Sequence, residues 1–182
     1  MTRGRSTVHS VSPRIFLALL CVFLSATSFS ACRAHTHTTV PDQATVRILL
    51  STVESTFAAM KNRDYPGIWT RLSSASRNTI VEDTRKAIAR SSGGEAPKDR
   101  IEQDFKEGGP VARTYWDGFL SRFNPEAALS KSRWEMGEAS DTEAYLLITH
   151  EGAEKPAVVR LYKEDGAWKM GLAETFWGQP VR

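Results

Sequence analysis

The sequence predicts an α+β domain in which the helices come first and the strands last. In the first part of the chain, apolar residues recur at intervals of three and four, which is typical of amphipathic helices. From Arg133 onward the interval changes to two, and β-branched and aromatic residues become frequent, as in strands. Helices that precede an antiparallel sheet pack on its apolar face. We therefore expect helices covering a curved, cone-like sheet of about four strands.

Composition agrees with a folded domain and bears on its partners. The chain has 182 residues, of which 41% are hydrophobic and 25% are charged, a balance that disordered chains do not have. Lys and Arg number 24 against 21 Asp and Glu, and Arg3, Arg5 and Arg14 account for the whole excess. From Cys32 onward the charges therefore balance. Without a basic stripe, we expect no binding to nucleic acid.

Residues 1–31 have the layout of an export signal. A polar and basic stretch ends at Arg14, an uninterrupted apolar run extends from Ile15 to Leu24, and small residues lead to Ala31. The apolar run is about half as long as the roughly 20 residues that a membrane-spanning helix needs. We therefore expect residues 1–31 to be removed as a signal peptide.

The end of this leader, Phe29-Ser30-Ala31-Cys32, resembles the lipobox of bacterial lipoproteins. The resemblance implies that Cys32 carries acyl chains such as palmitate and anchors the protein in a membrane. Ordinary cleavage that leaves Cys32 free or dimer-forming is the alternative. Arg33 is not the Asp that retains lipoproteins in the inner membrane. The expected location is thus the cell envelope, at the periplasmic face of the outer membrane in a Gram-negative cell.

Residues 32–41 form the expected lipidated tether, which is rich in Thr and His. His35 and His37 are of a residue type that binds copper and zinc. Two ligands on a flexible segment are too few for a dedicated site, so we expect a solvated linker and no metal. Residues 42–182 are then expected to form a single domain.

Two helices are expected at the start of this domain. The first extends from Asp42, a suitable N-cap, to about Asn62. Its apolar positions are Val46, Leu49, Leu50, Val53, Phe57 and Met60. Pro66 starts a short second helix that contains Trp69 and Leu72.

A third helix is expected after the serine cluster that ends at Ser76. Thr79 and Glu82 have the spacing of a capping box at its start. Its apolar positions are Ile80, Val81, Ala87 and Ile88. The segment 91–97, rich in Ser and Gly, is expected to be a loop.

Two further helices are predicted on either side of Gly108 and Gly109. Ile101 and Phe105 share one face of a brief helix that ends at these glycines, and Pro110 opens the next helix. One stripe of that next helix contains Val111, Tyr115, Phe119 and Phe123, with Trp116 and Leu120 beside it. We expect core packing for this stripe. The alternative is that this helix closes the mouth of a ligand cavity.

Four strands are expected around Trp134 to Met136, Tyr145 to Ile148, Val158 to Tyr162 and Trp168 to Leu172. Asp165-Gly166 is a typical two-residue turn of a β-hairpin. This turn pairs Leu161 with Met170 and Val159 with Leu172 on an apolar face, and Tyr162 with Lys169 on the other face. Continuing the same register places Glu174 on the apolar face, opposite Ala157.

These features together resemble a known superfamily. Asp64-Tyr65, the segment from Trp69 to Ser73 and the hairpin from Leu161 to Met170 are similar to periplasmic lipoproteins of the nuclear-transport-factor-2-like superfamily. That superfamily has the cone fold that ketosteroid isomerases share. The resemblance covers Ala44 to Ser73 and Arg133 to Phe176. It implies that the segment from Asp64 to Trp69 caps one end of the sheet, with Trp69 in the core.

The resemblance also implies where catalysis would occur. Enzymes of the superfamily use an acidic base or a His-Asp pair, with a hydrogen-bonding Tyr, inside the cone. The corresponding candidates in this chain are Glu174, His150 and Tyr145, and Tyr115 could point into the same space. A solvated carboxylate at a strand end is the simpler interpretation of Glu174. The glycine pairs at Gly93 and Gly108 lack the Lys and the setting of a nucleotide loop.

We therefore expect a protein that is not an enzyme and has no cofactor. The predicted function is that of a lipid-anchored binding or accessory module, which presents a cone cavity or a sheet surface to a small apolar ligand or an envelope protein. One alternative is an isomerase or dehydratase with an acid or base in the cone. The other alternative is a structural assembly subunit, which needs no cavity.

Overall fold

The computed structural model describes residues 41–92, 94 and 96–177, and these residues belong to one compact unit. The predicted signal peptide, the lipidated Cys32 and the tether as far as Val40 lie outside the described residues. Every described core residue lies in this unit. A chain that begins at Thr36 therefore retains that core, and we expect it to fold without the leader. Among the helices described, none is long and apolar enough to cross a lipid bilayer.

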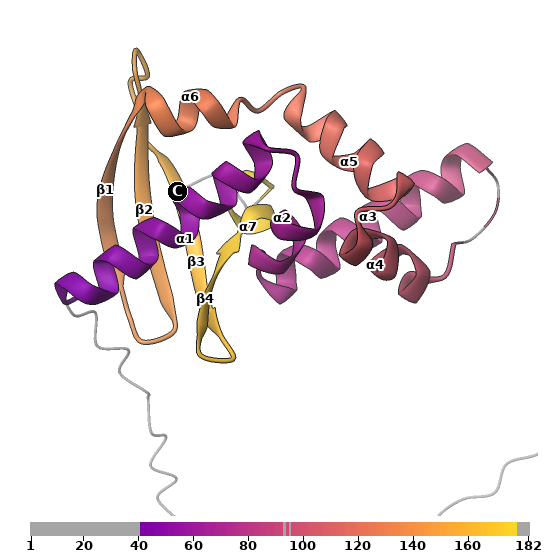
Figure 1. Cartoon of the computed structure of the whole chain (residues 1–182), viewed down its shortest axis with the longest axis horizontal. Coiled ribbons are helices and arrows are strands. Elements are labelled where there is room, and N and C mark those ends of the chain that lie inside the picture. The colour runs from indigo at the N-terminus through magenta and orange to yellow at the C-terminus, as the bar shows by residue number, and fades with distance from the viewer. Residues whose placement is uncertain (1–40, 93, 95, 178–182) are drawn as a thin grey trace, which may run out of the picture. The chain divides into compact units, whose positions relative to one another are not determined.

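The predicted α+β class is confirmed, with helices first and a four-stranded sheet after them (Figure 1). The helices are α1 (Gln43–Lys61), α2 (Tyr65–Arg71), α3 (Ser74–Ser92), α4 (Lys98–Glu107), α5 (Pro110–Leu120), α6 (Pro125–Ser130) and α7 (Leu172–Phe176). The strands are β1 (Ser132–Ala139), β2 (Glu143–His150), β3 (Ala157–Glu164) and β4 (Ala167–Gly171). Each strand pairs antiparallel with the next one in the chain.

The hairpin of β3 and β4 has the predicted turn. Asp165 and Gly166 have φ values of 51° and 78°, as the two central residues of a type I′ turn require. Leu161 pairs with Met170 and Tyr162 pairs with Lys169, so the predicted register is confirmed over this part of the hairpin.

One face of the sheet packs against α1, which crosses the strands in Figure 1. Leu146, Leu161 and Met170 from three different strands are fully buried in the common core. Phe57 of α1 meets Trp134 of β1, with ring centroids 5.8 Å apart. Such close contacts between large side chains are typical of a densely packed interior.

The starts of the first two helices follow local sequence signals. The carboxylate of Asp42 accepts a hydrogen bond from the backbone N–H of Thr45 at 2.7 Å, which confirms the predicted N-cap. The carboxylate of Asp64 accepts one from Gly67 N–H at 3.0 Å and caps α2. Short polar side chains at these positions satisfy N–H groups that have no partner inside the helix.

The predicted capping box of α3 is wrong, because this helix begins earlier, at Ser74. Thr79 lies inside the helix, where its hydroxyl donates to the backbone carbonyl of Ala75 at 3.0 Å. The first turn is held instead by Glu164 of β3, which accepts a hydrogen bond from Ser74 N–H at 2.8 Å. The Ser73 hydroxyl also accepts a hydrogen bond from Ser76 N–H at 3.0 Å. A local serine cap and the distant hairpin therefore hold the start of α3 together.

The predicted continuation of β4 beyond Gly171 is also wrong. The chain turns there into α7, so Val159 does not pair with Leu172 and Glu174 does not lie opposite Ala157. The hydroxyl of Thr175 accepts a hydrogen bond from Arg160 N–H at 3.1 Å and donates to the carbonyl of Gly171 at 2.6 Å. The Thr175 hydroxyl thus accepts the hydrogen bond that Arg160 N–H would donate to a backbone carbonyl if β4 continued.

The connection between α4 and α5 is tight. Gly108 ends α4 as predicted, in the left-handed conformation with φ of 67°. The carboxylate of Asp104 accepts a hydrogen bond from the N–H of Ala112 at 2.7 Å and so holds the first turn of α5. A Cβ at Gly109 would lie 2.2 Å from this carboxylate, so a larger residue there would displace the Asp104 side chain. Helix α6, which Asn124 caps, was not predicted.

Candidate functional site

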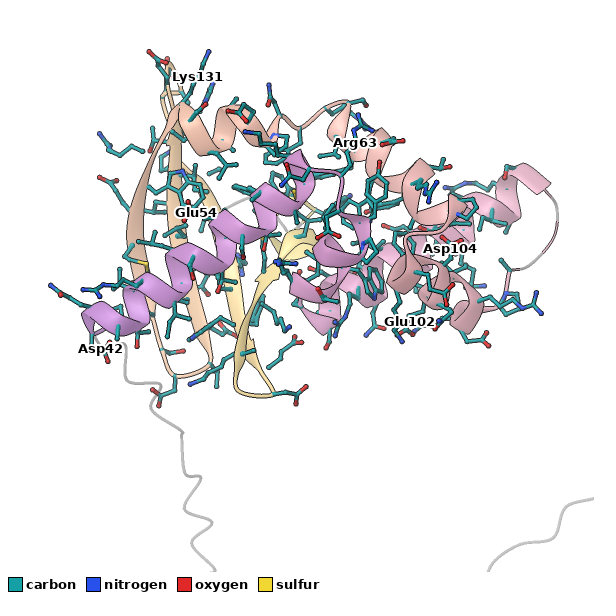
Figure 2. All side chains as sticks on the ribbon, viewed as in Figure 1. Asp42, Glu54, Arg63, Glu102, Asp104 and Lys131 are labelled. Carbon is teal, nitrogen blue, oxygen red and sulfur yellow. The ribbon has the colours of Figure 1, made fainter. Side chains whose placement is uncertain are left out.

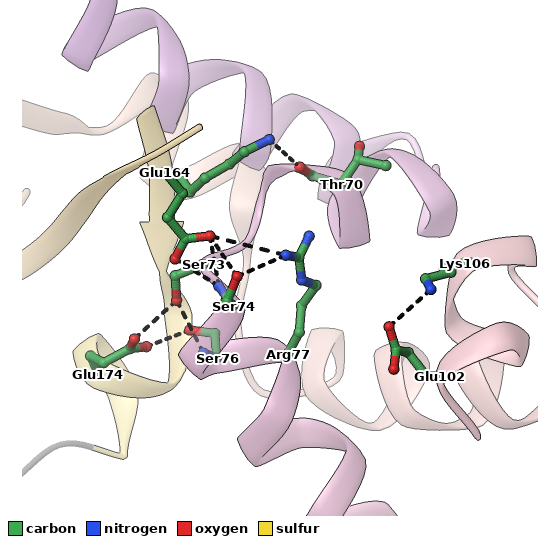
Figure 3. Close-up of polar contacts among 10 residues, drawn as sticks. Thr70, Ser73, Ser74, Ser76, Arg77, Glu102, Lys106, Glu164 and Glu174 are labelled. Carbon is green, nitrogen blue, oxygen red and sulfur yellow. Dashed lines mark hydrogen bonds and ion pairs between the residues drawn. The ribbon is translucent and has the colours of Figure 1, made fainter. Parts of the chain in front are cut away.

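Glu174 lies on α7, where both of its carboxylate oxygens are engaged (Figure 3). One oxygen accepts a hydrogen bond from the Ser73 hydroxyl at 2.9 Å, and the other accepts one from the Ser76 hydroxyl. The Ser76 hydroxyl in turn accepts a hydrogen bond from Ala173 N–H at 3.0 Å. The carboxylate therefore joins the start of α3 to α7.

The other two catalytic candidates are not beside Glu174. His150 is exposed at the end of β2, with Nδ1 3.4 Å from the hydroxyl oxygen of Ser132. The hydroxyl of Tyr145 lies 3.4 Å from the carboxylate of Glu143. The structure thus does not bring Glu174, His150 and Tyr145 together as one acid-base group.

The segment from Asp64 to Ser73 joins helices to the end of the sheet. Trp69 is 1% exposed, and its ring stacks on that of Phe105 with a centroid distance of 4.8 Å, which confirms it as a core residue. The hydroxyl of Tyr65 donates to Asp117 at 2.6 Å. Ser73 N–H donates to the carbonyl of Met170 at 2.9 Å, which ties this segment to β4.

A small cavity lies at the edge of the sheet, between α1 and β1. It has a volume of about 300 Å³ and is lined by Leu50, Glu54, Leu129, Ser132 and Trp134. Among these residues, the indole N–H of Trp134 donates to the carbonyl of Ala128 at 3.1 Å.

A larger open site lies along α5, where the apolar residues fall on two faces. Ala112 and Trp116 are fully buried. Val111, Tyr115 and Phe119, four residues apart and thus on one stripe, are only partly buried. The stripe is therefore packed against the core, as expected, but it is not fully buried. Trp116, which follows Tyr115 in the helix, is the residue that points into the core.

Two adjoining cavities follow the half-buried stripe, and together we call them the α5 groove. The first has a volume of about 570 Å³ and is lined by Asp83, Thr114, Tyr115, Gly118, Phe119, Arg122, Phe123, Phe176 and Trp177. The second has a volume of about 500 Å³ and is lined by Thr84, Ala87, Ile88, Ser91, Pro110, Val111, Thr114 and Tyr115. Because Thr114 and Tyr115 line both, the two cavities are neighbours along α5.

Aromatic side chains form one end of this groove. Phe176 and Trp177 are large apolar residues, yet they are 42% and 47% exposed. Trp177 stacks on Phe119 with a centroid distance of 6.0 Å, and Phe176 lies edge-on to Phe123 at 5.4 Å. The end of α7 is therefore packed against the end of α5, and both contribute open apolar surface.

Charged residues gather beyond the aromatic end. A third cavity, of about 400 Å³, adjoins the groove at Arg122 and Phe123, and Lys61 and Arg63 also line it. Arg63 lies in the turn between α1 and α2 (Figure 2) and is ion-paired with Asp117. Lys61 is ion-paired with a residue of α6. The guanidinium of Arg122 makes no hydrogen bond or ion pair with any described residue.

Two polar groups on the walls of the groove have unusual surroundings. Burial raises the pKa of Tyr115 above its ordinary value, and the negative charge of Asp83 raises it further. The hydroxyl of Thr84 is buried without a hydrogen-bond partner among the described residues. Among the described residues, neither side chain makes a hydrogen bond to a nucleophile or a base.

Sequence reasoning did not find this groove, although one signal was present. Gly118 lies in the last turn of α5, and glycine is unfavourable inside a helix. A Cβ built on Gly118 would meet no atom within 4 Å. A glycine on an apolar helix surface can indicate a gap in the packing. No comparable feature of the sequence indicates that α3 forms a wall of the groove or that Phe176 and Trp177 line it.

The described residues contain no group of three or more His, Cys, Asp and Glu side chains that could hold a metal ion. In comparisons with protein-family models, curated proteins and solved structures, none matches this chain. The α5 groove is therefore identified from the geometry of this chain.

Proposed function

We propose that this protein is a non-catalytic, lipid-anchored module of the cell envelope that binds a small apolar ligand in the α5 groove. One observation carries the proposal. The stripe of Val111, Tyr115 and Phe119 is left half-open, although the same helix is fully buried at Trp116. A ligand that covers this stripe would remove apolar surface from water.

The size and the lining of the groove support binding. Its two cavities, of about 570 and 500 Å³, fall within the range of about 300 to 1,000 Å³ that is usual for small-molecule sites. Exposed apolar patches on a soluble domain commonly mark a binding surface. The large aromatic rings of Phe119 and Trp177 each offer a large apolar area for a ligand to cover.

The contacts of Glu174 favour a non-catalytic role. A general base must reach the proton that it removes, directly or through one water. Both carboxylate oxygens of Glu174 already accept hydrogen bonds from Ser73 and Ser76. The residue therefore has a structural task that is sufficient to explain its position.

The anchoring part of the proposal rests on Cys32 and the leader before it. Replacing this residue in Cys32→Ala is expected to remove palmitate labelling and to leave the protein soluble or uncleaved. The measurement is membrane fractionation together with metabolic acyl labelling. Wild-type protein that is found in the soluble fraction with an unmodified N-terminus would contradict the anchor.

The groove itself is tested by filling it. In Gly118→Leu the new side chain enters open space, because a Cβ at this position meets no atom within 4 Å. The matched control is Gly118→Ala, which adds helix propensity without filling the groove. Both variants are expected to be at least as stable as the wild type, since glycine costs about 1 kcal/mol in a helix interior relative to alanine.

The readout is the fluorescence of N-phenyl-1-naphthylamine, a neutral probe whose emission rises in an apolar site. We expect residues 36–182 to enhance the emission, the Gly118→Ala variant to retain the enhancement and the Gly118→Leu variant to lose most of it. Equal enhancement by both variants would show that the probe binds elsewhere. No enhancement by the unmodified chain would contradict an apolar binding site.

A further inference from the structure

The lining of the α5 groove changes in character from one end to the other. At the end near the start of α5, Ala87, Ile88 and Val111 provide an aliphatic surface. Aromatic rings line the middle, and Arg122 lies at the far end. The same apolar-to-charged sequence is found along an amphiphile. The lining of the groove therefore matches an amphiphile more closely than it matches a wholly apolar molecule.

The groove is also elongated. It follows α5, whose 11 residues span about 16 Å at a rise of about 1.5 Å per residue. Its two cavities lie one after the other along the helix, with Thr114 and Tyr115 lining both. A single flexible chain can occupy cavities that lie in such a row.

The charge that remains without a partner at the far end is positive. Lys61 and Arg63 are each ion-paired, whereas the guanidinium of Arg122 has no partner among the described residues. Asp83 is the acidic residue on the groove wall, and its carboxylate lies 3.8 Å from the ammonium of Lys86. A guanidinium binds carboxylates and phosphates through strong, charge-assisted hydrogen bonds.

We propose that the α5 groove binds a single-chain anionic amphiphile, with its carboxylate or phosphate head at Arg122 and its acyl tail directed toward Ile88. This inference rests on the proposed function and names the class of ligand for the same site. A fatty acid and a lysophospholipid share this chemistry.

The aromatic rings could instead bind a cationic ligand head, and the experiment distinguishes this from an anionic head. Rings of Phe119, Phe176 and Trp177 near the carboxylate of Asp83 could bind a quaternary ammonium group through cation–π interactions. The ion pair between Asp83 and Lys86 already offsets the acidic charge. The anionic head is therefore the arrangement that the charges favour.

The test uses residues 36–182 and four probes with the same alkyl tail: dodecanoate, dodecyl phosphate, dodecanol and dodecyltrimethylammonium. Each probe carries bromine on the tail, because bromine quenches tryptophan fluorescence on contact. Trp177 lines the groove and reports binding there. The variant Trp177→Phe, which keeps an aromatic ring, is expected to lose the quenching. This control assigns the signal to the groove.

We expect dodecanoate or dodecyl phosphate to bind more tightly than dodecanol. In Arg122→Gln, anion binding should weaken about tenfold, as expected for the loss of one charge-assisted hydrogen bond, while dodecanol binding should change less than about twofold. The matched control is Arg100→Gln on α4, an exposed arginine that lines neither cavity. It should leave all four dissociation constants unchanged. A preference for the carboxylate indicates a fatty acid, and a preference for the phosphate indicates a lysophospholipid.

Three results would overturn the proposal, and they differ in what they leave standing. Equal binding of dodecanoate and dodecanol, with no effect of Arg122→Gln, would remove the anionic head but keep the apolar groove. Tighter binding of dodecyltrimethylammonium would assign the site to a cation. Quenching of Trp177 by none of the four probes would contradict both this inference and the proposed function.

Discussion

The β3–β4 hairpin and α5 both carry apolar stripes, but the two stripes are covered to different extents. On the hairpin, Leu161 and Met170 have no exposed surface beneath the helices. On α5, Tyr115 and Phe119 remain partly open to solvent. Their neighbour Trp116 is as deeply buried as the residues of the hairpin.

The difference arises from the shapes of the two elements. A strand points its side chains to two faces, so one layer of helices covers every apolar residue on one face of the sheet. Helix α5 has apolar residues over a wider arc. The face of α5 that carries Trp116 packs on α4, where the ring centroids of Trp116 and Phe105 are 6.3 Å apart. The apolar surface that remains faces α3 and forms the groove.

The largest expected effect separates the two faces of α5. Truncation of the buried ring in Trp116→Ala is expected to lower the free energy of unfolding by about 3 to 5 kcal/mol, because it leaves a cavity in the core. The matched truncation Phe119→Ala should cost only about 1 kcal/mol, since this ring borders open space. Urea unfolding followed by circular dichroism measures both. Equal losses would mean that the groove is closed in solution.

The next prediction concerns the turn of the hairpin. Valine at a φ of 78° is strained, so Gly166→Val should destabilise the protein by about 1 to 3 kcal/mol. Gly166→Asn, which tolerates positive φ, should cost less than about 1 kcal/mol. The free energies of unfolding of the two variants give the comparison. Similar small losses in both would contradict the turn geometry.

A smaller effect is expected at Glu174, whose carboxylate links α3 to α7. Replacement in Glu174→Gln removes the charged acceptor from the hydroxyls of Ser73 and Ser76 and should cost about 1 kcal/mol. The exposed Glu154→Gln is the matched control and should be neutral. Thermal unfolding measures both. If Glu174→Gln left stability unchanged but abolished the turnover of a substrate, the structural role would be refuted.

The smallest effect is expected at Thr84, on the α3 wall of the groove. Its hydroxyl is buried and has no hydrogen-bond partner in the part of the chain that the structure describes, so the nearly isosteric Thr84→Val should be neutral or stabilising by up to about 1 kcal/mol. Thr79→Val, which loses a hydrogen bond to the carbonyl of Ala75, is the comparison. A loss of stability in Thr84→Val would show that the hydroxyl has a partner in solution.

The sequence predicts the features that depend on nearby residues. Asp42 caps α1 through Thr45, and the pair Asp165 and Gly166 sets both the turn and the register between Leu161 and Met170. These interactions are complete within a few residues, so local spacing reveals them.

The remaining features depend on residues far apart in the chain. The backbone N–H of Ser74, at the start of α3, donates to Glu164 of the hairpin, and β4 ends where the Thr175 hydroxyl accepts a hydrogen bond from Arg160 N–H. The same holds for the candidate site. Whether Trp116 or Phe119 is buried depends on where α4 and α3 pack, which the periodicity of α5 alone does not determine.

The most direct test of the account asks where a ligand changes the protein. Amide hydrogen exchange of residues 36–182 is measured with and without dodecanoate and, separately, with dodecanol. We predict that exchange slows in α5, around Tyr115 to Leu120, and at the end of α7, and that β2 is unchanged. Protection that instead appears at Leu50 and Trp134 would place the ligand in the cavity between α1 and β1 and contradict the α5 groove.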